Sequence, residues 1–222
     1  PPFQEETASY FIGINRNKRA LALDLRQEEG RDVLMRLLAH ADVVLENFKT
    51  GTMERWGIGP EVLRERFPAL IYCRVSGFEA MGGLMSVNGT EESGPTRVGL
   101  PLVDMVTGMN AVQGILLALH HRSRTGMGQF IEAALFDSAL SLLHPHAANY
   151  ALSGKLPKLT GNDHPNISPY SAYATGGRPI YLSVGNDRQF ARLCELIDAP
   201  DIATDPRFSS NGNRVNNRAA LR

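Results

Sequence analysis

Hydrophobic residues recur at helical spacing in the middle of the chain, between Met105 and Leu119. The members that follow one another at intervals of one to four residues are Met105, Val106, Met109, Val112, Ile115, Leu116 and Leu119. This pattern is typical of a helix with one apolar face, so we expect a long helix whose face is buried in the core. The sequence RSRTGMGQ follows at 122–129, and its cations and glycines are suited to the end of a helix.

Shorter patterns before this helix alternate between strand and helix. Residues 20–25 have leucine at every second position, which predicts a strand. Residues 27–41 have the spacing of an amphipathic helix. The remaining elements expected here are a short helix at 60–67 and buried strands at 42–48, 68–77 and 129–135. Strands separated by helices favour a parallel α/β sheet with right-handed crossovers.

The second half of the chain predicts shorter elements. In order, they are a surface connection at 82–99, a helix from Asp137 to Tyr150, a strand at 178–184, a turn and cap at 185–189, and a helix at 190–197. Residues 161–170 contain a glycine and two prolines, so no helix is expected to continue through them.

Composition and charge narrow the class of protein. Lys plus Arg and Asp plus Glu both number 23 in the 222 residues, so no overall field attracts nucleic acid or an anionic membrane. No run approaches eighteen apolar residues and nothing resembles a signal peptide, so we expect a cytoplasmic protein without a membrane segment. The two cysteines, Cys73 and Cys194, predict buried thiols and not a disulfide framework. No metal site is expected, since His144 and His146 have no third ligand at a plausible spacing.

Two acidic residues stand near predicted helix starts, Asp104 and Asp137. One interpretation of Asp104 is a helix cap, because aspartate readily accepts hydrogen bonds from the first N–H groups of a helix. The other is a nucleophilic or proton-transferring carboxylate, because a strand-to-helix junction presents a side chain at a ligand crevice. Local physics leaves both interpretations open, and it does not distinguish Asp104 from Asp137.

The sequence VDMVTGM at 103–109, followed by RSRTGMGQ at 122–129, closely resembles family III CoA-transferases. That family includes formyl-CoA transferase and carnitine CoA-transferase. The segments NRNKR at 15–19, ENF at 46–48 and PALIYCRVSGF at 68–78 resemble it in the same order. The resemblance covers almost the whole chain. It implies a Rossmann-like parallel sheet in a large CoA-binding domain at 1–172, the start of a smaller α+β domain at 173–222, and an interlocked homodimer.

The resemblance also implies an activity. It assigns Asp104 the role of a covalent nucleophile and leaves Asp137 structural. CoA would move from an acyl-CoA thioester to a small carboxylic acid through an aspartyl mixed anhydride and an aspartyl-CoA thioester. Since the energy of the thioester is retained throughout, neither ATP, a metal nor a permanently bound cofactor is expected, and CoA is a substrate.

Binding residues follow from the resemblance by matching position. The candidates for contact with CoA are Leu23, Asp24, Leu25, Arg26, Asn47, Phe48, Lys49 and Arg55. Gly161 and His164 are candidates for an active-site loop. The competing interpretation of each cation is a solvated side chain at the edge of a loop, which is common for Lys and Arg. The acyl group is open; a dicarboxylic substrate such as succinyl-CoA is favoured, with Arg16, Arg74 or Arg97 as candidates for its distal carboxylate.

Relatives usually carry an additional strand-helix-strand unit before residue 1 and a further segment after Phe78, and both are expected to be missing from this sequence. One alternative is a 2-methylacyl-CoA racemase of the same fold, in which the matching aspartate works with a histidine from that second segment. Another is a non-catalytic CoA-binding relative in which Asp104 only caps a helix. A dinucleotide-dependent dehydrogenase is disfavoured, because no G-x-G-x-x-G sequence follows a strand.

Overall fold

The computed structural model describes residues 3–4, 7–77 and 79–222. The chain divides into two compact units. The first unit is Pro1–Arg74 with Gly114–Ile131, and the second unit is Val75–Gln113 with Glu132–Arg222. The predicted division into domains at 1–172 and 173–222 stays a prediction.

The elements up to the long helix are β1 (Phe3–Gln4), β2 (Thr7–Ala8), α1 (Ser9–Ile14), α2 (Glu28–Leu38), β3 (Val43–Glu46), α3 (Thr52–Arg55), α4 (Pro60–Arg66), β4 (Ile71–Ser76), η1 (Glu79–Gly82), η2 (Leu84–Ser86), β5 (Gly89–Thr90) and β6 (Gly94–Pro95). From the long helix onward they are α5 (Leu102–Thr125), β7 (Phe130–Ala134), α6 (Leu135–Leu142), α7 (His146–Ser153), β8 (Tyr170–Tyr173), β9 (Ile180–Ser183), α8 (Asp187–Leu196), α9 (Pro200–Thr204), α10 (Asn211–Asn216) and α11 (Arg218–Leu221).

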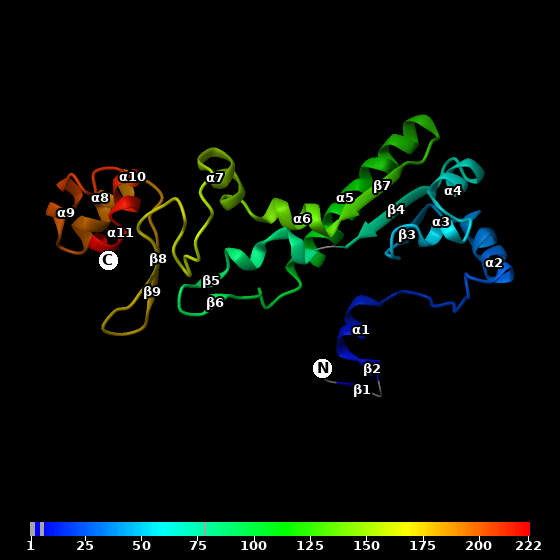
Figure 1. Cartoon of the computed structure of the whole chain (residues 1–222), viewed down its shortest axis with the longest axis horizontal. Coiled ribbons are helices and arrows are strands. Elements are labelled where there is room, and N and C mark those ends of the chain that lie inside the picture. Colours follow the sequence, from blue (N-terminus) through cyan, green and yellow to red (C-terminus); the bar gives the residue numbers. More distant parts are fainter. Residues whose placement is uncertain (1–2, 5–6, 78) are drawn as a thin grey trace. The chain divides into compact units, whose positions relative to one another are not determined.

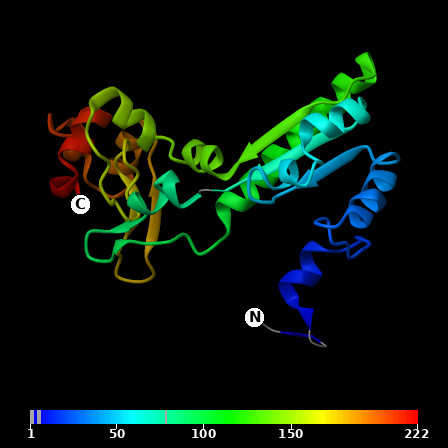
Figure 2. The same cartoon turned by 45° about the vertical axis from the view of Figure 1, so that its right-hand side comes forward.

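A three-stranded sheet in the order β3-β4-β7 organises the first unit, and Figures 1 and 2 show these strands side by side. β3 and β4 are parallel, with Val43 opposite Ile71 and Glu46 opposite Arg74. Since α3 and α4 lie between these strands in the sequence, the connection has the strand-helix-strand form that the sequence predicted. The parallel α/β class is therefore confirmed, as are the elements predicted at 27–41, 42–48, 60–67, 68–77 and 129–135, within a few residues at their ends.

The core of the first unit is a cluster of buried side chains contributed by the helices and β4. Its members are Met35, Leu38, Met53, Ile58, Leu63, Leu70 and Tyr72. The turn before β7 passes so close to β4 that a Cβ atom on Gly128 would collide with the backbone carbonyl of Leu70. Glycine is therefore required at this point of the turn.

The second unit contains its own small core around α8. Val184, Phe190, Cys194 and Phe208 form it, beside the antiparallel pair β8 and β9. The Asn186 side chain caps α8 by accepting a hydrogen bond from the backbone N–H of Gln189 at 3.0 Å. The predicted strand at 178–184 is confirmed as β9, and the helix predicted at 190–197 begins three residues earlier, at Asp187.

A buried arginine fastens the C-terminal helices of the second unit. The Arg214 guanidinium donates hydrogen bonds to the carbonyl oxygens of Ser168 at 2.8 Å and Phe208 at 3.0 Å, and to Asp187 Oδ1 at 2.7 Å. It also lies over the Phe190 ring, 4.4 Å from the ring centroid. These contacts satisfy the buried charge, and through them Arg214 connects α10 to α8 and to the loop before β8.

Both cysteines are free and buried, as expected. Burial raises the pKa of the Cys73 thiol, and the Glu46 charge acts in the same direction. Burial also raises the pKa of the Cys194 thiol. Neither thiol is therefore an activated nucleophile.

The strand predicted at 20–25 is wrong, because these residues have no regular secondary structure. The Asp24 carboxylate instead accepts hydrogen bonds from the backbone N–H and the guanidinium of Arg26, which close a local turn. Such side-chain contacts compete with strand pairing. The single helix predicted from Asp137 to Tyr150 is also wrong: it is divided into α6 and α7 at Pro145, which has no N–H group to continue a helix.

The face of α5 that is buried differs from the predicted one. Val103, Thr107, Ala111 and Ala118 are its buried positions, whereas Met109 of the predicted apolar face is 60% exposed. Met105, Val112 and Leu116 are also exposed. The small side chains allow close packing, as at Gly114, where a Cβ atom would lie 2.9 Å from Ile131 Cγ2. The expectation that the apolar face is buried is therefore wrong for this chain.

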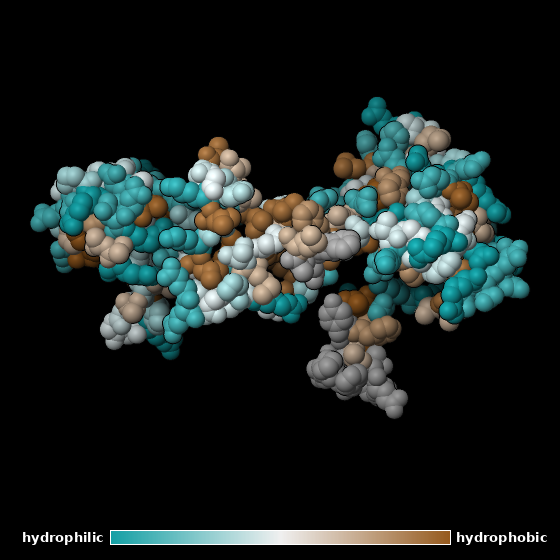
Figure 3. Space-filling view, in the orientation of Figure 1, coloured by the Kyte–Doolittle hydropathy of each residue, from teal (hydrophilic) through white to brown (hydrophobic). Residues whose placement is uncertain are grey.

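Apolar surface is not confined to α5. Figure 3 shows it over α6, where Leu140 is among the exposed hydrophobic residues. Within the described residues, α5 is the one helix long and apolar enough to cross a membrane by length and composition, a test that core helices of soluble proteins also pass. Asp104, Asn110 and Gln113 interrupt its apolar sequence.

Candidate active site

Asp104 lies on the first turn of α5, two residues after the helix begins at Leu102. Its side chain is exposed, and the structure records no hydrogen bond to its carboxylate from any residue that it describes. The carboxylate is therefore not engaged as a helix cap here. The partial positive charge at the N-terminus of a helix favours negative charge at this position.

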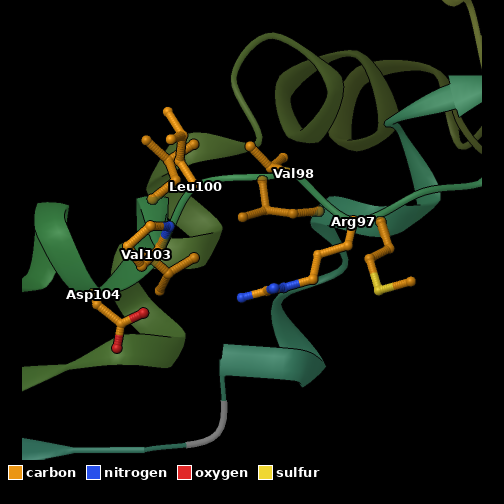
Figure 4. A pocket seen from close by; sticks show the side chains of 9 residues that line it. Arg97, Val98, Leu100, Val103 and Asp104 are labelled. Atoms are coloured by element: carbon orange, nitrogen blue, oxygen red, sulfur yellow. The ribbon is translucent and has the colours of Figure 1, made fainter. Parts of the chain in front are cut away.

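The Asp104 side chain lines a small pocket in the second unit, with a volume of about 200 Å³ (Figure 4). The other lining residues are Leu84, Met85, Arg97, Val98, Leu100, Pro101, Leu102 and Val103. The lining is mainly apolar, with one anionic and one cationic side chain among the residues that form it. Figure 4 shows the Arg97 side chain extending toward the side of the pocket where Asp104 lies.

Hydrogen bonds fix the backbone around this pocket. The N–H of Met105 donates to the carbonyl of Pro101 at 3.0 Å, and the Thr107 hydroxyl donates to the carbonyl of Val103 at 2.7 Å. Asn110 Nδ2 donates to the Ser138 hydroxyl at 3.2 Å and so joins α5 to α6. The first turn of α5 is thereby held in place, which fixes the backbone from which the Asp104 side chain extends.

Asp137 offers a direct comparison. It lies on the first turn of α6 and is exposed, as Asp104 is on α5. It does not line the pocket described above. The structure thus separates two aspartates that local sequence patterns could not distinguish, because only Asp104 faces that cavity.

The candidates for CoA contact lie in the first unit, in two segments. In one segment, Arg26 Nε and Nη2 each donate to an oxygen of Asp24 at 2.9 Å. The hydrogen bond from the Arg26 side chain lowers the pKa of the Asp24 carboxyl to about 2. Leu25 packs against the core cluster of this unit, as does Trp56 near the other segment. Leu23 is half-buried in the same irregular stretch.

The other segment follows β3, where the strand's carboxyl end opens into a loop. Asn47, Phe48 and Lys49 are all exposed there. The Phe48 ring packs edge-on against Trp56, with centroids 5.3 Å apart. Arg55 Nη2 donates to the Thr52 hydroxyl at 2.8 Å and the side chain is otherwise at the surface. Ligands of parallel α/β sheets bind outside the carboxyl ends of the strands, which is where this loop lies.

A buried ion-pair network, which sequence reasoning missed, holds this loop. Arg74 Nε donates to Glu46 Oε1 and Arg74 Nη2 to Glu54 Oε1, both at 2.6 Å. The Tyr72 hydroxyl donates to Glu46 Oε1 at 3.2 Å, and the Phe48 N–H donates to Glu46 Oε2 at 2.8 Å. The Arg74 hydrogen bond lowers the pKa of Glu54, and burial raises the pKa of Tyr72 to about 12. Arg74 already has two carboxylate partners, which removes it as a candidate for a substrate carboxylate.

The segment 161–170 is held within the second unit. The Gly161 N–H donates to the carbonyl of Gly89 at 2.8 Å. His164 Nδ1 accepts from the Asn166 N–H at 3.1 Å, and the ring stacks on Tyr170 at a centroid distance of 5.0 Å. Burial, followed by the charge of Arg218, lowers the pKa of His164. Neither Gly161 nor His164 lines the pocket that contains Asp104.

Among the described residues, no group of three or more His, Cys, Asp or Glu side chains is arranged to hold a metal ion. The candidate residues fall in two places, each in its own unit: Asp104 and its pocket belong to the second unit, and the two segments expected to contact CoA belong to the first.

Comparison with known proteins identifies the family. The model of CoA-transferase family III matches residues 1–222. The chain belongs to CoA-transferase family III. The resemblance seen in the sequence is thereby confirmed.

Relatives of this family III chain are named for several acyl groups. It is 37% identical to succinyl-CoA:mesaconate CoA-transferase of Haloarcula hispanica, over 100% of this chain and 62% of the relative. It is 38% identical to succinate–glutarate CoA-transferase of Agrobacterium fabrum and 36% identical to acetyl-CoA:oxalate CoA-transferase of Acetobacter aceti, in each case over 100% of this chain and 61% of the relative. The chain thus spans about three fifths of the length of these relatives.

The first of these alignments has 247 positions, 25 more than the 222 residues of the family III chain, so the relative carries residues without a counterpart here. The expected gap after Phe78 stays a prediction, and Phe78 lies outside the described residues.

Solved structures agree on the fold of the family III chain. A CaiB/BaiF family protein from Brucella suis is 41% identical, with a TM-score of 0.75 over 98% of this chain and 62% of that one. The hypothetical protein Rv3272 from Mycobacterium tuberculosis is 32% identical, with a TM-score of 0.78 over 93% of this chain and 59% of that one.

Proposed function

We propose that this protein is a CoA-transferase that moves CoA from an acyl-CoA thioester to a carboxylic acid, with Asp104 as the covalent nucleophile. The observation that carries the proposal is the Asp104 carboxylate, which lines an otherwise mainly apolar pocket from the first turn of α5. Membership of CoA-transferase family III and the names of the relatives support the same reaction class.

The reaction needs only the carboxylate and the two substrates. An Asp104 oxygen attacks the thioester carbonyl, the C–S bond breaks, and an aspartyl mixed anhydride and CoA thiolate result. The thiolate attacks the Asp104 carbonyl of the anhydride, which releases the donor acid and leaves an aspartyl-CoA thioester. The acceptor carboxylate attacks that thioester to form a second anhydride, and CoA thiolate then attacks its acyl carbonyl to form the new thioester and regenerate Asp104. Covalent catalysis divides one difficult exchange into easier steps.

The proposed site favours these steps electrostatically. Negative charge develops on an oxygen next to the N-terminus of α5, whose partial positive charge stabilises it. Water would hydrolyse the anhydride, so it must be kept away while the acyl group is bound, and the apolar side chains of Leu84, Leu100 and Val103 contribute to this.

CoA binding is assigned in this proposal to Leu23, Asp24, Leu25, Arg26, Asn47, Phe48, Lys49 and Arg55. The cations among them suit the phosphate groups of CoA, and the exposed Phe48 ring offers a flat apolar surface. Arg26 uses Nε and Nη2 for Asp24, so its Nη1 donors can bind a phosphate group without breaking that pair. No permanently bound cofactor enters the reaction.

The proposal includes an interlocked homodimer in the cytoplasm, with no nucleic acid or membrane as partner. The exposed Met105, Met109, Val112 and Leu116 on α5 support a second protein surface over this helix. Sedimentation at micromolar concentration measures the oligomeric state directly, and a monomer at every concentration would contradict the homodimer.

The decisive experiment is mass spectrometry of the intact protein after incubation with a panel of acyl-CoA thioesters and quenching with hydroxylamine or borohydride. We expect a modification that maps to Asp104 and is absent from Asp104→Asn. Asp137→Asn is the matched control, because it changes the same group on the first turn of another helix. An unmodified protein that exchanges the α-proton of a 2-methylacyl-CoA would instead support the racemase. A protein that binds CoA without either reaction would support the non-catalytic alternative.

A further inference from the structure

The pocket that contains Asp104 also contains a cation whose role the transfer reaction does not explain. Arg97 lies on the stretch between β6 and α5, and its side chain extends into the pocket from the side opposite the α5 turn (Figure 4). The sequence offers three arginines, Arg16, Arg74 and Arg97, as candidates for binding a substrate carboxylate. Arg74 is occupied by Glu46 and Glu54, and Arg16 does not line the pocket, which leaves Arg97.

We propose that Arg97 recognises the distal carboxylate of a dicarboxylic acyl group and so determines the acyl specificity of the enzyme. This inference rests on the proposed transferase function, because it places the reacting carbonyl of the same acyl group at Asp104. The guanidinium presents a planar set of N–H donors that matches a carboxylate, with two parallel hydrogen bonds.

The size of the pocket agrees with an acyl group. Its volume of about 200 Å³ is below the roughly 300–1,000 Å³ typical of sites for whole drug-sized ligands, so it suits the acyl part of the thioester and not the nucleotide. Leu84, Met85 and Leu100 provide apolar contacts for the methylene groups between the two carbonyl carbons. A charged group at each end and apolar walls between them are complementary to a short dicarboxylic half-thioester.

Arg97 has no carboxylate partner among the described residues, whereas Arg26, Arg74 and Arg122 each form an ion pair. Its guanidinium is therefore available to a ligand. The backbone before it is fixed: the Thr96 N–H donates to the Asn88 carbonyl at 2.8 Å, and Asn88 Nδ2 donates to the Thr96 carbonyl at 3.0 Å. Since β5 and β6 pair at the same place, the base of the Arg97 side chain is positioned before substrate arrives.

The test compares succinyl-CoA with butyryl-CoA, in which a methyl group replaces the distal carboxylate. Arg97→Met should lower kcat/KM for succinyl-CoA by roughly 10- to 150-fold, the range for losing a hydrogen bond to a charged group. The value for butyryl-CoA should stay unchanged or rise. Arg97→Lys, which keeps the charge without the planar donors, should restore part of the succinyl-CoA activity. The affinity for free CoA should be unaltered, because CoA has no acyl carboxylate.

Arg124→Met is the matched control, since Arg124 is an exposed arginine that does not line the pocket. Arg124→Met should leave kcat/KM unchanged for both thioesters. If Arg97→Met lowered kcat/KM equally for both thioesters, or changed neither value, the role of Arg97 would be refuted. A wild-type preference for butyryl-CoA over succinyl-CoA would refute it as well. A wild-type protein that forms no Asp104 adduct with any thioester refutes the transferase function itself, whereas normal adducts with unaltered selectivity refute this inference alone.

Discussion

Replacing Arg74 by methionine should destabilise the first unit severely. Arg74 is 7% exposed and its partner Glu46 is 6% exposed, so the substitution leaves a carboxylate buried without its counter-charge. Removing one member of a buried ion pair costs about 3–5 kcal/mol. The second partner, Glu54, has 36% of its side chain exposed and regains water, so its loss adds less than about 1 kcal/mol. We expect a total loss of about 3–5 kcal/mol.

The chain contains its own probe for this measurement. Trp56 is the only tryptophan, and it packs against the core of the first unit, next to Glu54. Its fluorescence during urea denaturation therefore reports the unfolding of that unit. Arg124→Met is again a suitable control, because it removes the same charge from an exposed position.

A double-mutant cycle identifies the cause. In Glu46→Gln/Arg74→Met no charge remains buried at the centre of the network, so the double variant should lose less stability than the two single changes added together. A loss below about 1 kcal/mol for Arg74→Met, or additive single effects, would refute the reasoning. Acid provides a further check. Arg74 lowers the pKa of Glu54, so the ionised Glu54 carboxylate stabilises the folded protein. This stabilisation is present above the unfolded-state pKa of Glu54 and is lost as pH falls through its folded-state pKa. In Arg74→Met this acid-dependent loss should disappear.

Two other predictions concern local features. Gly128→Ala should destabilise the protein in denaturant titrations, because its Cβ atom would collide with the Leu70 carbonyl. Gly108→Ala, in the interior of α5, is the control and should stabilise the protein by about 0.5–1 kcal/mol. Equal effects of the two substitutions would contradict the close approach of Gly128 to Leu70. His164, whose pKa is lowered by burial, should titrate in NMR below its ordinary value. Since its protonated form is disfavoured in the fold, its contribution to stability is present above its unfolded pKa and should be lost as pH falls from there through the lower folded pKa. A pKa at or above about 6.5 would contradict the half-buried position.

The elements that the sequence predicted well are those specified by local patterns. The amphipathic spacing in 27–41 and the apolar runs of β3, β4 and β7 contain enough information to place each element. The period-two pattern at 20–25 failed because a strand also needs a partner, and the Asp24–Arg26 contact offers the backbone a turn instead.

The α5 face shows a different limit of pattern reasoning. This helix has large apolar residues on one side and small ones, such as Ala111 and Ala118, on another. Hydropathy favoured the large residues for the core, but the side that is buried carries small residues, and at Gly114 the helix passes close to Ile131 of β7. The sequence therefore predicted the helix correctly, but it did not predict that the face with the small residues is the buried one.

At the site, the sequence located Asp104 only through the family resemblance, because Asp137 has the same local setting. The Glu46–Arg74 pair depends on the register between β3 and β4, which no single-strand pattern specifies. That Arg97 and Asp104 line the same pocket likewise depends on how residues 84–104 fold back on themselves.

The burial of both thiols has a practical consequence. Cys73 is 0% exposed and Cys194 is 1% exposed, and the chain has no other cysteine. A cysteine introduced on the surface would consequently be the sole accessible thiol in the folded protein. Placed at Leu100, on the rim of the pocket, this cysteine would accept a single fluorophore, and neither native cysteine would have to be replaced. The wild-type sequence is thus already a background for site-specific labelling, and substrate entry at Asp104 becomes readable as a change in light emission.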